Sequence, residues 1–371
     1  MSQLKVLNAN LCPDGVPLVS LGSICEFNRG RWVKADQLIP GNVPVVTSSR
    51  VIGAYHNASN RQGTTVVVAS SGAYAGFVSL WTVPIYLSNA FSVDVKDSQA
   101  VMPEYLYLVL RYKQDEIHAL ASTGGVPNVY GADLASIKVP VPPLEAQREI
   151  VRILDKFSAL EAELEAELEA RRRQFEVYRN LLISGASDSA PSVKLSEVLQ
   201  YEQPTKYLVS STDYNDAHPT PVLTAGKTFV LGHTDETSGI YPASTDNPVI
   251  IFDDFTTAFH WVDFPFKAKS SAMKMLKPRH GVSADFRYVY YAMSCVNFHP
   301  SQHTRHWISQ YGEFEIPLPD MAVQLEIVRA LDALVALVGD VSAGLPAEIV
   351  ARKKQYEYYR EQLLTFKELK S

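Results

Sequence analysis

The strongest constraint on the fold of this 371-residue chain is that part of its sequence occurs twice. The segment "VPPLEAQREIVRILDKFSAL" at 141–160 is similar to "LPDMAVQLEIVRALDALVAL" at 318–337, with matching residues 177 positions apart. Further on, "ARRRQFEVYRNLL" at 170–182 is similar to "ARKKQYEYYREQLL" at 351–364, now at an offset of 181. Self-similarity at a fixed offset indicates two copies of one structural unit, and a fold built from such copies.

Weaker similarity extends the repeat to the segments in front of each block. The segment "VPLVSLGSI" at 16–24 is similar to "SVKLSEVL" at 192–199, and "IKVPVPP" at 137–143 is similar to "FEIPLPD" at 314–320. The chain therefore has the plan of a unit, a helical segment, a second unit and a second helical segment. The predicted boundaries are 1–143, 144–185, 186–318 and 319–371.

Both units have the pattern of β-rich domains. Short apolar runs such as "TTVVVAS" at 64–70 and "NPVIIFDDF" at 247–255 are separated by clusters of Gly, Pro, Asn and Ser. This pattern is typical of strands joined by turns. A helical stretch is expected at 103–120 in the first unit and at 286–295 in the second. The predicted fold class is therefore α+β.

The segments after the two units have the pattern of long helices. In the first of them, apolar residues recur at alternating steps of three and four, the spacing of a packed helix seam. The stretch "LEAELEAELEA" at 160–170 interrupts the alternation with two successive steps of four, which is a four-residue stutter. In the second segment, Gly339, Gly344 and Pro346 predict a kink or break near 344–346.

Such helices need a partner. A helix of about 40 residues is about 60 Å long, and its single apolar seam is not stable alone in water. The simplest arrangement packs the two helices on each other as an antiparallel coiled coil with a pseudo-twofold internal repeat. The residues expected to form this seam are Ile150, Phe157, Leu160, Leu164, Leu168, Phe175, Tyr178, Ile327, Leu331, Leu334, Tyr356 and Tyr359.

This plan, and above all the paired helix sequences, resembles the specificity subunit of Type I restriction-modification systems. The segment "GLPAEIVARKKQYEYYREQLL" at 344–364 is similar to the typical sequence of the family. The first helix departs from it, with "LEAELEAELEA" where "LPAEI" would stand. The resemblance implies two target recognition domains, each reading one half of a bipartite, asymmetric site on double-stranded DNA. It also implies that the two antiparallel helices act as a spacer.

The resemblance further implies that the chain is not an enzyme and binds no cofactor itself. In this family two modification subunits dock on the specificity subunit and methylate adenine with S-adenosylmethionine. Restriction subunits join them as translocases and use ATP and Mg²⁺. The seam residues given above are then also candidates for subunit docking. In that architecture, the tetrapeptide repeat is expected to set the length of the unspecified spacer between the half-sites.

Composition bears on location and on nucleic acid. No run of 18 or more apolar residues is present, so no membrane span is expected, and residues 1–10 lack a signal-peptide pattern. The three cysteines, few and odd in number, favour a reduced, cytoplasmic protein. A net charge of −6 opposes binding to phosphates. However, residues 267–306 contain seven Lys and Arg against one acid, so the local charge leaves DNA open.

Motifs for chemistry are incomplete in this sequence. The Gly-Lys-Thr at 226–228 lacks the first glycine of a phosphate-binding loop, because Pro221 stands in its place. His299, His303 and His306 have metal-like spacing, but no Cys or carboxylate motif completes a ligand set, which disfavours a metal site.

The remaining observations favour a reader of DNA over an enzyme. Asp253 and Asp254 are adjacent on a predicted strand and would point to opposite faces, which disfavours a joint acid–base role. Neither an adenine-methylase tetrapeptide of the Asn/Asp-Pro-Pro-aromatic kind nor a glycine-rich S-adenosylmethionine loop is present. The alternative is a coiled-coil scaffold with two protein- or sugar-binding modules. A generic scaffold has no reason to duplicate the helix sequences.

Loops rich in cations, amides and hydroxyls supply the candidate DNA contacts, since base edges are read by donors and acceptors and phosphates by cations and amides. For each residue taken singly, the alternative is a solvated surface position; the sets together favour DNA. In the first unit the candidates are Asn28, Arg29, Arg31, Ser48, Ser49, Arg50, His56, Asn57, Arg61, Ser71, Tyr74, Asn128 and Tyr130. In the second unit they are Lys227, Thr228, His260, Lys267, Lys269, Ser270, Lys274, Gln302, His303 and Arg305.

Overall fold

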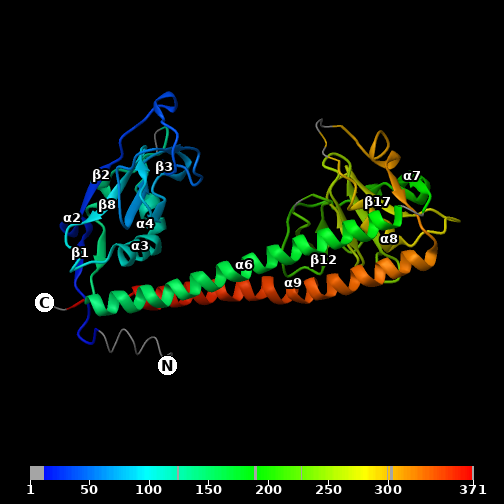
Figure 1. Ribbon diagram of the computed structural model, residues 1–371. Helices are drawn as coiled ribbons and strands as arrows, with labels where there is room; N and C mark the ends of the chain where they lie inside the picture. Colours follow the sequence, from blue (N-terminus) through cyan, green and yellow to red (C-terminus); the bar gives the residue numbers. More distant parts are fainter. Residues whose placement is uncertain are drawn as a thin grey trace. The chain divides into compact units, whose positions relative to one another are not determined.

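The chain forms two compact units, each of which holds one β-rich domain and part of both long helices (Figure 1). The computed structural model describes residues 12–122, 125–187, 190–226, 228–298, 300 and 304–369. Unit 1 comprises Met1–Ala166 and Ala347–Ser371, and unit 2 comprises Glu167–Pro346. The long helices are α6 (Leu144–Ser187) and α9 (Met321–Leu364).

The described part of unit 1 contains a four-stranded sheet, a three-stranded sheet and a strand pair. The antiparallel four-stranded sheet has the order β2 (Cys25–Arg29), β8 (Ala90–Val95), β5 (Thr65–Ala69) and β6 (Val78–Trp81). The three-stranded sheet has the order β4 (Tyr55–His56), β3 (Val43–Val46) and β7 (Tyr86–Leu87), with β3 and β7 parallel. Strand β1 (Leu18–Ser20) pairs with β9 (Lys138–Pro140). The helices are α2 (Leu21–Ile24), α3 (Pro103–Tyr112), α4 (Gln114–Ala119), α5 (Gly131–Leu134), and the 3-10 turns η1 (Ala35–Gln37) and η2 (Gly72–Tyr74).

Alternation along β5 places two cores on the two faces of the four-stranded sheet. Val66 and Val68 lie in one core with Leu106 of α3, whereas Val67 lies in a second core with Leu87 of β7. Successive residues of a strand point to opposite faces, so one strand supplies both cores. Helix α3 lies between the strands of unit 1 and α6 (Figure 1).

Unit 2 repeats this topology strand for strand. Its four-stranded sheet has the order β11 (Leu199–Glu202), β17 (Met273–Pro278), β14 (Val249–Asp253) and β15 (Phe259–Val262). Its three-stranded sheet has the order β13 (Val230–Thr234), β12 (Thr220–Leu223) and β16 (Lys267–Ala268), with β12 and β16 parallel. Strand β10 (Ser192–Lys194) pairs with β18 (Glu315–Pro317). The helices are α7 (Leu195–Val198) and α8 (Phe286–Met293), with the 3-10 turns η3 (Pro204–Tyr207) and η4 (Tyr311–Glu313).

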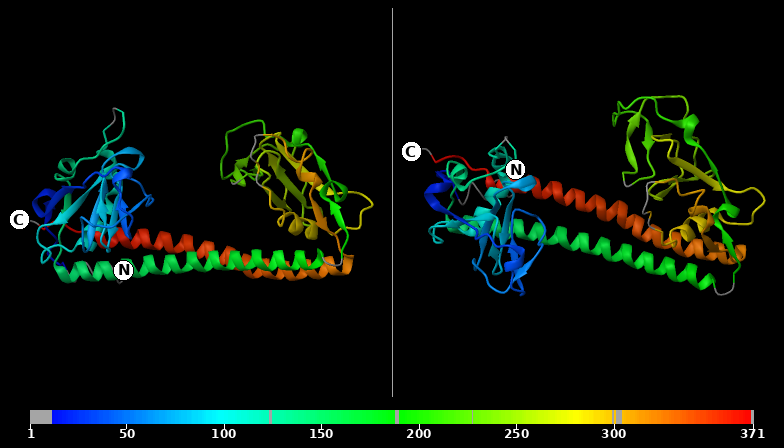
Figure 2. Two further views of the ribbon diagram at one scale, coloured as in Figure 1. Left: turned by 45° about the horizontal axis from the view of Figure 1, so that its top comes forward. Right: turned by 90° about the horizontal axis from the view of Figure 1, so that it is seen from above.

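The α+β class and the antiparallel long helices are confirmed. Within unit 1, the C-terminal part of α9 lies beside the N-terminal part of α6 in both views of Figure 2. The rings of Phe157 and Tyr359 are 5.0 Å apart there. The Lys353 ammonium lies 3.3 Å from a carboxylate oxygen of Glu161 and 2.9 Å from one of Glu165. The contact between the two helices in unit 1 is therefore both apolar and ionic.

Most residues of the expected seam are covered, but Tyr178 is not. Tyr178 is 44% exposed, and its neighbour Arg179 is half-buried instead, with its guanidinium 6.0 Å from the Phe175 ring. At 3.6 residues per turn, the third and fourth residues after Phe175 both lie near the seam. These residues are Tyr178 and Arg179, and Arg179 is the one that is covered. Ile150, Leu168, Ile327 and Leu331 are buried, and Phe157, Leu160, Leu164, Phe175, Leu334, Tyr356 and Tyr359 are half-buried.

Of the kink or break predicted near 344–346, a break is not present. Helix α9 continues from Met321 to Leu364 through Pro346. Of the helices in the described residues, none is long and apolar enough to cross a membrane.

The two long helices are joined to their units by the same contact. In unit 1, the Gln147 side chain accepts a hydrogen bond from the Met102 amide at 2.8 Å and donates to the proline carbonyl five residues earlier. In unit 2, Gln324 accepts from the Asp285 amide at 2.8 Å and donates to the corresponding proline carbonyl. Both glutamines are buried, and both amides lie at the residue that caps a helix of the unit, α3 or α8. The sequence repeat therefore corresponds to a repeated junction.

Candidate nucleic-acid interface

In unit 1, strand β2 ends in a cationic segment that is held against the turn between β7 and β8. The Arg31 amide donates to the Leu87 carbonyl at 2.9 Å. A Cβ atom at Gly30 would lie 2.1 Å from the Ser88 carbonyl oxygen, so only glycine permits this approach. The side chains of Arg29 and Arg31, on either side of the glycine, are both exposed.

A polar pocket of about 370 Å³ opens beside this segment. The guanidinium of Arg29 lies 5.9 Å from the centre of the Tyr130 ring, and Trp32 is 65% exposed at the pocket wall. In the grooves of double-stranded DNA, amides and guanidinium groups bond to base edges, and rings make apolar contacts with bases. The predicted residues that line the pocket are Arg29, Ser71, Asn128 and Tyr130. Ser70, in the same predicted turn as Ser71, also lines it, and the residues that sequence reasoning missed are Trp32, Ser88 and Asn89.

One of these missed residues, Trp32, could have been identified from the sequence. Trp32 directly follows the selected Arg31, and an exposed tryptophan next to two arginines is a candidate stacking residue. Asn89 had no such neighbour in the sequence. The pairing of β8 with β2 and β5, together with hydrogen bonds to Ser70 and Ser71, brings Asn89 to the pocket.

A second exposed cation lies above aromatic rings. The guanidinium of Arg50 is 4.7 Å from the centre of the Tyr74 ring and 4.6 Å from that of Phe77. Ser48, in contrast, is occupied inside the unit: its hydroxyl donates to the Asn89 carbonyl at 2.5 Å and accepts from two backbone amides at the end of β5. Arg50 and Tyr74 therefore remain candidates for DNA contact, whereas Ser48 holds the loop.

Arg61, which was predicted to contact DNA, instead makes hydrogen bonds within unit 1. Its guanidinium donates to the carbonyls of Asn28, Arg29 and Asn60 at 3.0, 3.1 and 2.9 Å, and to the Ser92 hydroxyl at 2.9 Å. A guanidinium has five N–H donors. The guanidinium of Arg61 makes four hydrogen bonds within the protein. Arg61 therefore supports the end of β2 that presents Arg29, and it is not assigned to DNA.

His56 is corrected for a similar reason. It is buried, its Nδ1 atom lies 3.1 Å from the Ile39 carbonyl, and its ring packs edge-on to Tyr86 at 4.8 Å. A buried ring that is engaged on both sides does not reach a groove. The remaining candidates of unit 1, Asn28, Ser49 and Asn57, are exposed.

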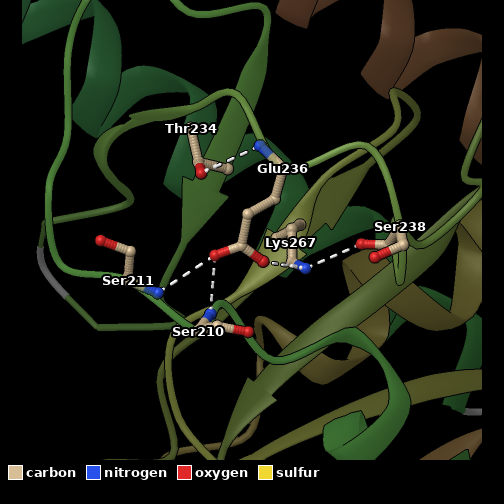
Figure 3. Close-up of polar contacts among 6 residues, drawn as sticks. All are labelled: Ser210, Ser211, Thr234, Glu236, Ser238 and Lys267. Carbon is tan, nitrogen blue, oxygen red and sulfur yellow. Dashed lines mark hydrogen bonds and ion pairs between the residues drawn. The ribbon is translucent and has the colours of Figure 1, made fainter.

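In unit 2, the buried Lys267 lies at the centre of a polar cluster (Figure 3). Its ammonium group donates to Glu236 at 2.5 Å and to the Ser238 carbonyl at 2.8 Å. The second carboxylate oxygen of Glu236 accepts from the amides of Ser210 and Ser211 at 2.8 and 3.1 Å. Lys267, predicted to contact DNA, therefore ties three segments of the unit together.

The contacts of this cluster shift the titration of its carboxylate. The hydrogen bond from Lys267, supported by the amides of Ser211 and Ser210, lowers the pKa of Glu236 to about 2, although burial acts in the opposite direction. The glutamate is consequently ionised at every pH at which the protein is expected to act.

Lys274 is the second predicted cation that the structure buries. Its ammonium lies 3.1 Å from a carboxylate oxygen of Asp254, and both side chains are 2% exposed. A buried charge is stabilised by its partner, so separating this pair to reach a phosphate would leave two buried charges uncompensated. Lys267 and Lys274 are thus both reassigned from DNA contact to the interior.

The other candidates of unit 2 lie at the surface or partly covered. Lys269 is half-buried, with its ammonium 5.5 Å from the centre of the Tyr214 ring. His260 is half-buried, with its Nε2 atom 3.1 Å from the Gly226 carbonyl. Thr228, Ser270 and Arg305 are exposed. Lys227, Gln302 and His303 lie outside the described residues.

Candidate metal ligands are not clustered within the described residues. Among them, no group of three or more His, Cys, Asp and Glu could hold a metal ion; His299 and His303 lie outside that part of the chain. Asp253 caps the turn after β14, whereas Asp254 pairs with a lysine, so the two carboxylates have separate roles. Burial raises the pKa of the Cys25 thiol to about 12, which keeps it protonated.

Unit 1 therefore presents exposed cations beside aromatic rings, and unit 2 presents the half-buried Lys269 beside Tyr214 and the exposed Arg305. Two copies of such a unit, joined to the same pair of helices, define a two-module recognition protein. Residues 13–170 match the family model of the Type I restriction modification DNA specificity domain. The match covers less than half of this chain, and the assignment it supports is one of similarity to the specificity subunits of Type I restriction-modification systems.

Individual relatives support this assignment over different parts of the chain. The EcoR124I/EcoR124II specificity subunit of Escherichia coli is 55% identical over 183 residues, which are 47% of this chain and 44% of that subunit. The chain thus matches less than half of that relative's length. A putative type I specificity subunit of Mycoplasma pneumoniae is 24% identical over 92% of this chain and 95% of its own. The crystal structure of the S subunit from M. genitalium shares the fold, with a TM-score of 0.64 at 15% identity, over 94% of this chain and 96% of that one.

Proposed function

We propose that each unit reads one half of a bipartite, asymmetric site on double-stranded DNA. The observation that supports this most directly is one strand order present twice with different loop chemistry on it. Unit 1 presents Arg29, Tyr130 and amide groups around a pocket, and unit 2 presents Lys269 and Arg305. Cations position a protein on phosphates, while amides and rings read bases. Different loops on the same scaffold read different sequences, which makes the site asymmetric.

The chain on this proposal performs no chemistry itself. Adenine methylation comes from two docked modification subunits with S-adenosylmethionine, and cleavage comes from restriction subunits with ATP and Mg²⁺, in the cytoplasm. Exposed apolar residues on the long helices suit such docking. They are Val177, Tyr178, Leu181, Val323 and Leu325 in unit 2, and Val350 and Tyr358 in unit 1. All three cysteines are free thiols, as suits a reducing compartment.

Methylome sequencing tests the proposal in the host. Deleting the gene is expected to abolish adenine methylation at one bipartite motif, and a plasmid copy is expected to restore it. The purified complex with modification subunits is expected to retain duplexes with that motif over duplexes with a scrambled motif. A scaffold with two non-DNA modules would leave the methylome unchanged and show no sequence-dependent retention.

We further propose that the repeat at 160–170 sets the spacer between the half-sites. Two of its glutamates, Glu161 and Glu165, lie four residues apart and both contact Lys353, whereas Glu167 pairs with Arg171 of its own helix at 2.6 Å. One tetrapeptide lengthens a helix by about 6 Å and rotates the downstream part of the helix by about 40°. That rotation is close to the roughly 34–36° between successive base pairs of B-DNA. Each added repeat would therefore correspond to about one base pair of spacer.

A further inference from the structure

We infer that the buried pair Asp254–Lys274 is a positioning device for DNA recognition by unit 2, acting through the loop at 304–308. This inference rests on the proposed function, because the loop carries the exposed Arg305. Neither charge of the pair reaches the surface, so its effect on DNA has to be indirect.

The pair lies at the end of two central strands. Lys274 is in β17, in register with Phe252 of β14, and Asp254 directly follows β14. The ammonium of Lys274 also lies 4.4 Å from the centre of the Tyr201 ring, which covers it from β11. The lysine is therefore enclosed by a carboxylate and a ring, and it has no freedom to turn outward.

The other oxygen atoms of Asp254 accept hydrogen bonds from the loop at 304–308. Its free carboxylate oxygen accepts from the Trp307 amide at 2.8 Å, and its backbone carbonyl accepts from the His306 amide at 2.8 Å. Trp307 itself is buried, with its ring 5.2 Å from that of Phe252. Two consecutive amides of the loop are thus fixed by one residue, immediately after Arg305.

Unit 1 has the corresponding contact between the end of a strand and a loop, but without charged side chains. There the Val129 amide donates to the Ser70 carbonyl at 2.9 Å, as the His306 amide does to Asp254. The residue in register at the position of Lys274 is Phe91, which is buried and opposite Val68 of β5. By this correspondence, Arg305 occupies the place of Asn128, and Trp307 that of Tyr130. The loop of unit 1 lines the polar pocket, so the loop of unit 2 is the equivalent reading loop.

The ion pair contributes orientation that backbone contacts alone do not. Charge-assisted hydrogen bonds are shorter and more directional than neutral ones. A buried ion pair is a weak source of stability, because desolvation offsets its attraction, but it defines one arrangement of the groups around it. Asp254 therefore fixes where the Arg305 backbone leaves the unit, and Lys274 holds the Asp254 side chain in place.

The test measures sequence discrimination by the full complex of this chain with its modification subunits. The probes are a duplex with the methylome-derived motif and duplexes with one base pair changed in either half-site. Lys274→Met and Asp254→Ala are expected to reduce discrimination at least tenfold at one half-site, the same for both variants. Discrimination at the other half-site is expected to stay as in the wild type.

Val262→Ala is the matched control for lost stability. Val262 is fully buried in unit 2, but it belongs to the core on the other side of the sheet from Trp307. This variant is expected to lower the melting temperature and to keep discrimination at both half-sites. The inference is overturned if Lys274→Met keeps discrimination, or if Val262→Ala loses as much of it. A wild-type complex with no discrimination at all would instead overturn the proposed function.

Discussion

At Gly30, the absence of a side chain decides how the surface around it is built. The chain passes so close to the turn after β7 that a methyl group would meet the Ser88 carbonyl at 2.1 Å and the Leu87 carbonyl at 2.7 Å. Both contacts are with backbone, which has no rotamer with which to yield. The exposure of Arg29 and Arg31 therefore depends on a residue that contacts no ligand itself.

Gly30→Ala is expected to destabilise unit 1 by about 1–3 kcal/mol, the usual cost of overpacking, and to weaken DNA binding. Thermal unfolding and a gel-shift titration measure the two effects. Gly53→Ala is the matched control, since a Cβ there would meet nothing within 4 Å. Equal behaviour of the two variants would show that the approach at Gly30 is not required.

The pKa of Glu236 makes the stability of unit 2 depend on pH. The folded-state pKa of about 2 is below the ordinary value of 4.5, so the stabilising contribution is present above about pH 4.5 and is lost as the pH falls toward 2. Glu236→Gln is expected to be less stable than the wild type at pH 7, with a difference that shrinks between pH 4.5 and 2. Urea unfolding at a series of pH values measures it. A difference independent of pH would contradict the assigned cause.

The two buried lysines show what single residues do not reveal in sequence. Lys267 and Lys274 lie in a basic stretch, and a lysine is rarely buried without a partner. Their partners, Glu236 and Asp254, are 31 and 20 positions away, and only strand pairing brings them close. Local charge predicted a DNA surface, whereas the pairing of strands placed these charges in the interior. Arg61 was also predicted to contact DNA, and it too is held inside its unit by partners that are mostly distant in sequence.

Among the elements, the long helices were predictable because their signal is periodic and repeated. The spacing of apolar residues predicted the seam residues to within one position. The exception is Tyr178, because the next residue, Arg179, also lies near the seam and is covered instead. The strands were predictable as a class but not in their order, because pairing depends on contacts distant in sequence. Agreement between the two halves of the chain supplied part of that missing information.

Deletion of Leu164–Glu167 is expected to shorten the spacer of the methylated motif by about one base pair while both half-sites stay unchanged. After the deletion, Leu168 and Glu169 take the places of Leu164 and Glu165, so the contact with Lys353 is retained by an equivalent glutamate. Methylome sequencing of the deletion strain measures the spacing.

A control that preserves helix length separates spacing from charge. Glu165→Gln combined with Glu167→Gln removes two of the ion pairs and leaves the residue count unchanged. This variant is expected to keep the spacer of the wild type. If the deletion keeps that spacer as well, the helix does not set the distance.

In the whole molecule, the two units are expected to contribute independently to DNA affinity. Arg31→Ala in unit 1 and Arg305→Ala in unit 2 lie in different units and share no partner. Their effects on binding free energy should therefore add to within about 0.5 kcal/mol. Each variant that removes a phosphate contact should reduce the slope of log affinity against log salt by about one.

Filter binding at several salt concentrations, with the two single variants and the double variant, measures these quantities. The matched control is Ser270→Ala, which removes an exposed hydroxyl without a charge and should leave the slope unchanged. Affinity and slope equal to the wild type in both arginine variants would remove them from the interface.

The repeated glutamine contact has a consequence for how such proteins diversify. Gln147 and Gln324 attach their helices to different units by the same pair of hydrogen bonds. The attachment involves the backbone at the start of α3 or α8, and not the loops that differ between the units. A recombination event that exchanges one unit for another with the same attachment would keep the junction intact. Genetic exchange of whole segments can thus create a new preference in one generation, without a series of compensating point mutations.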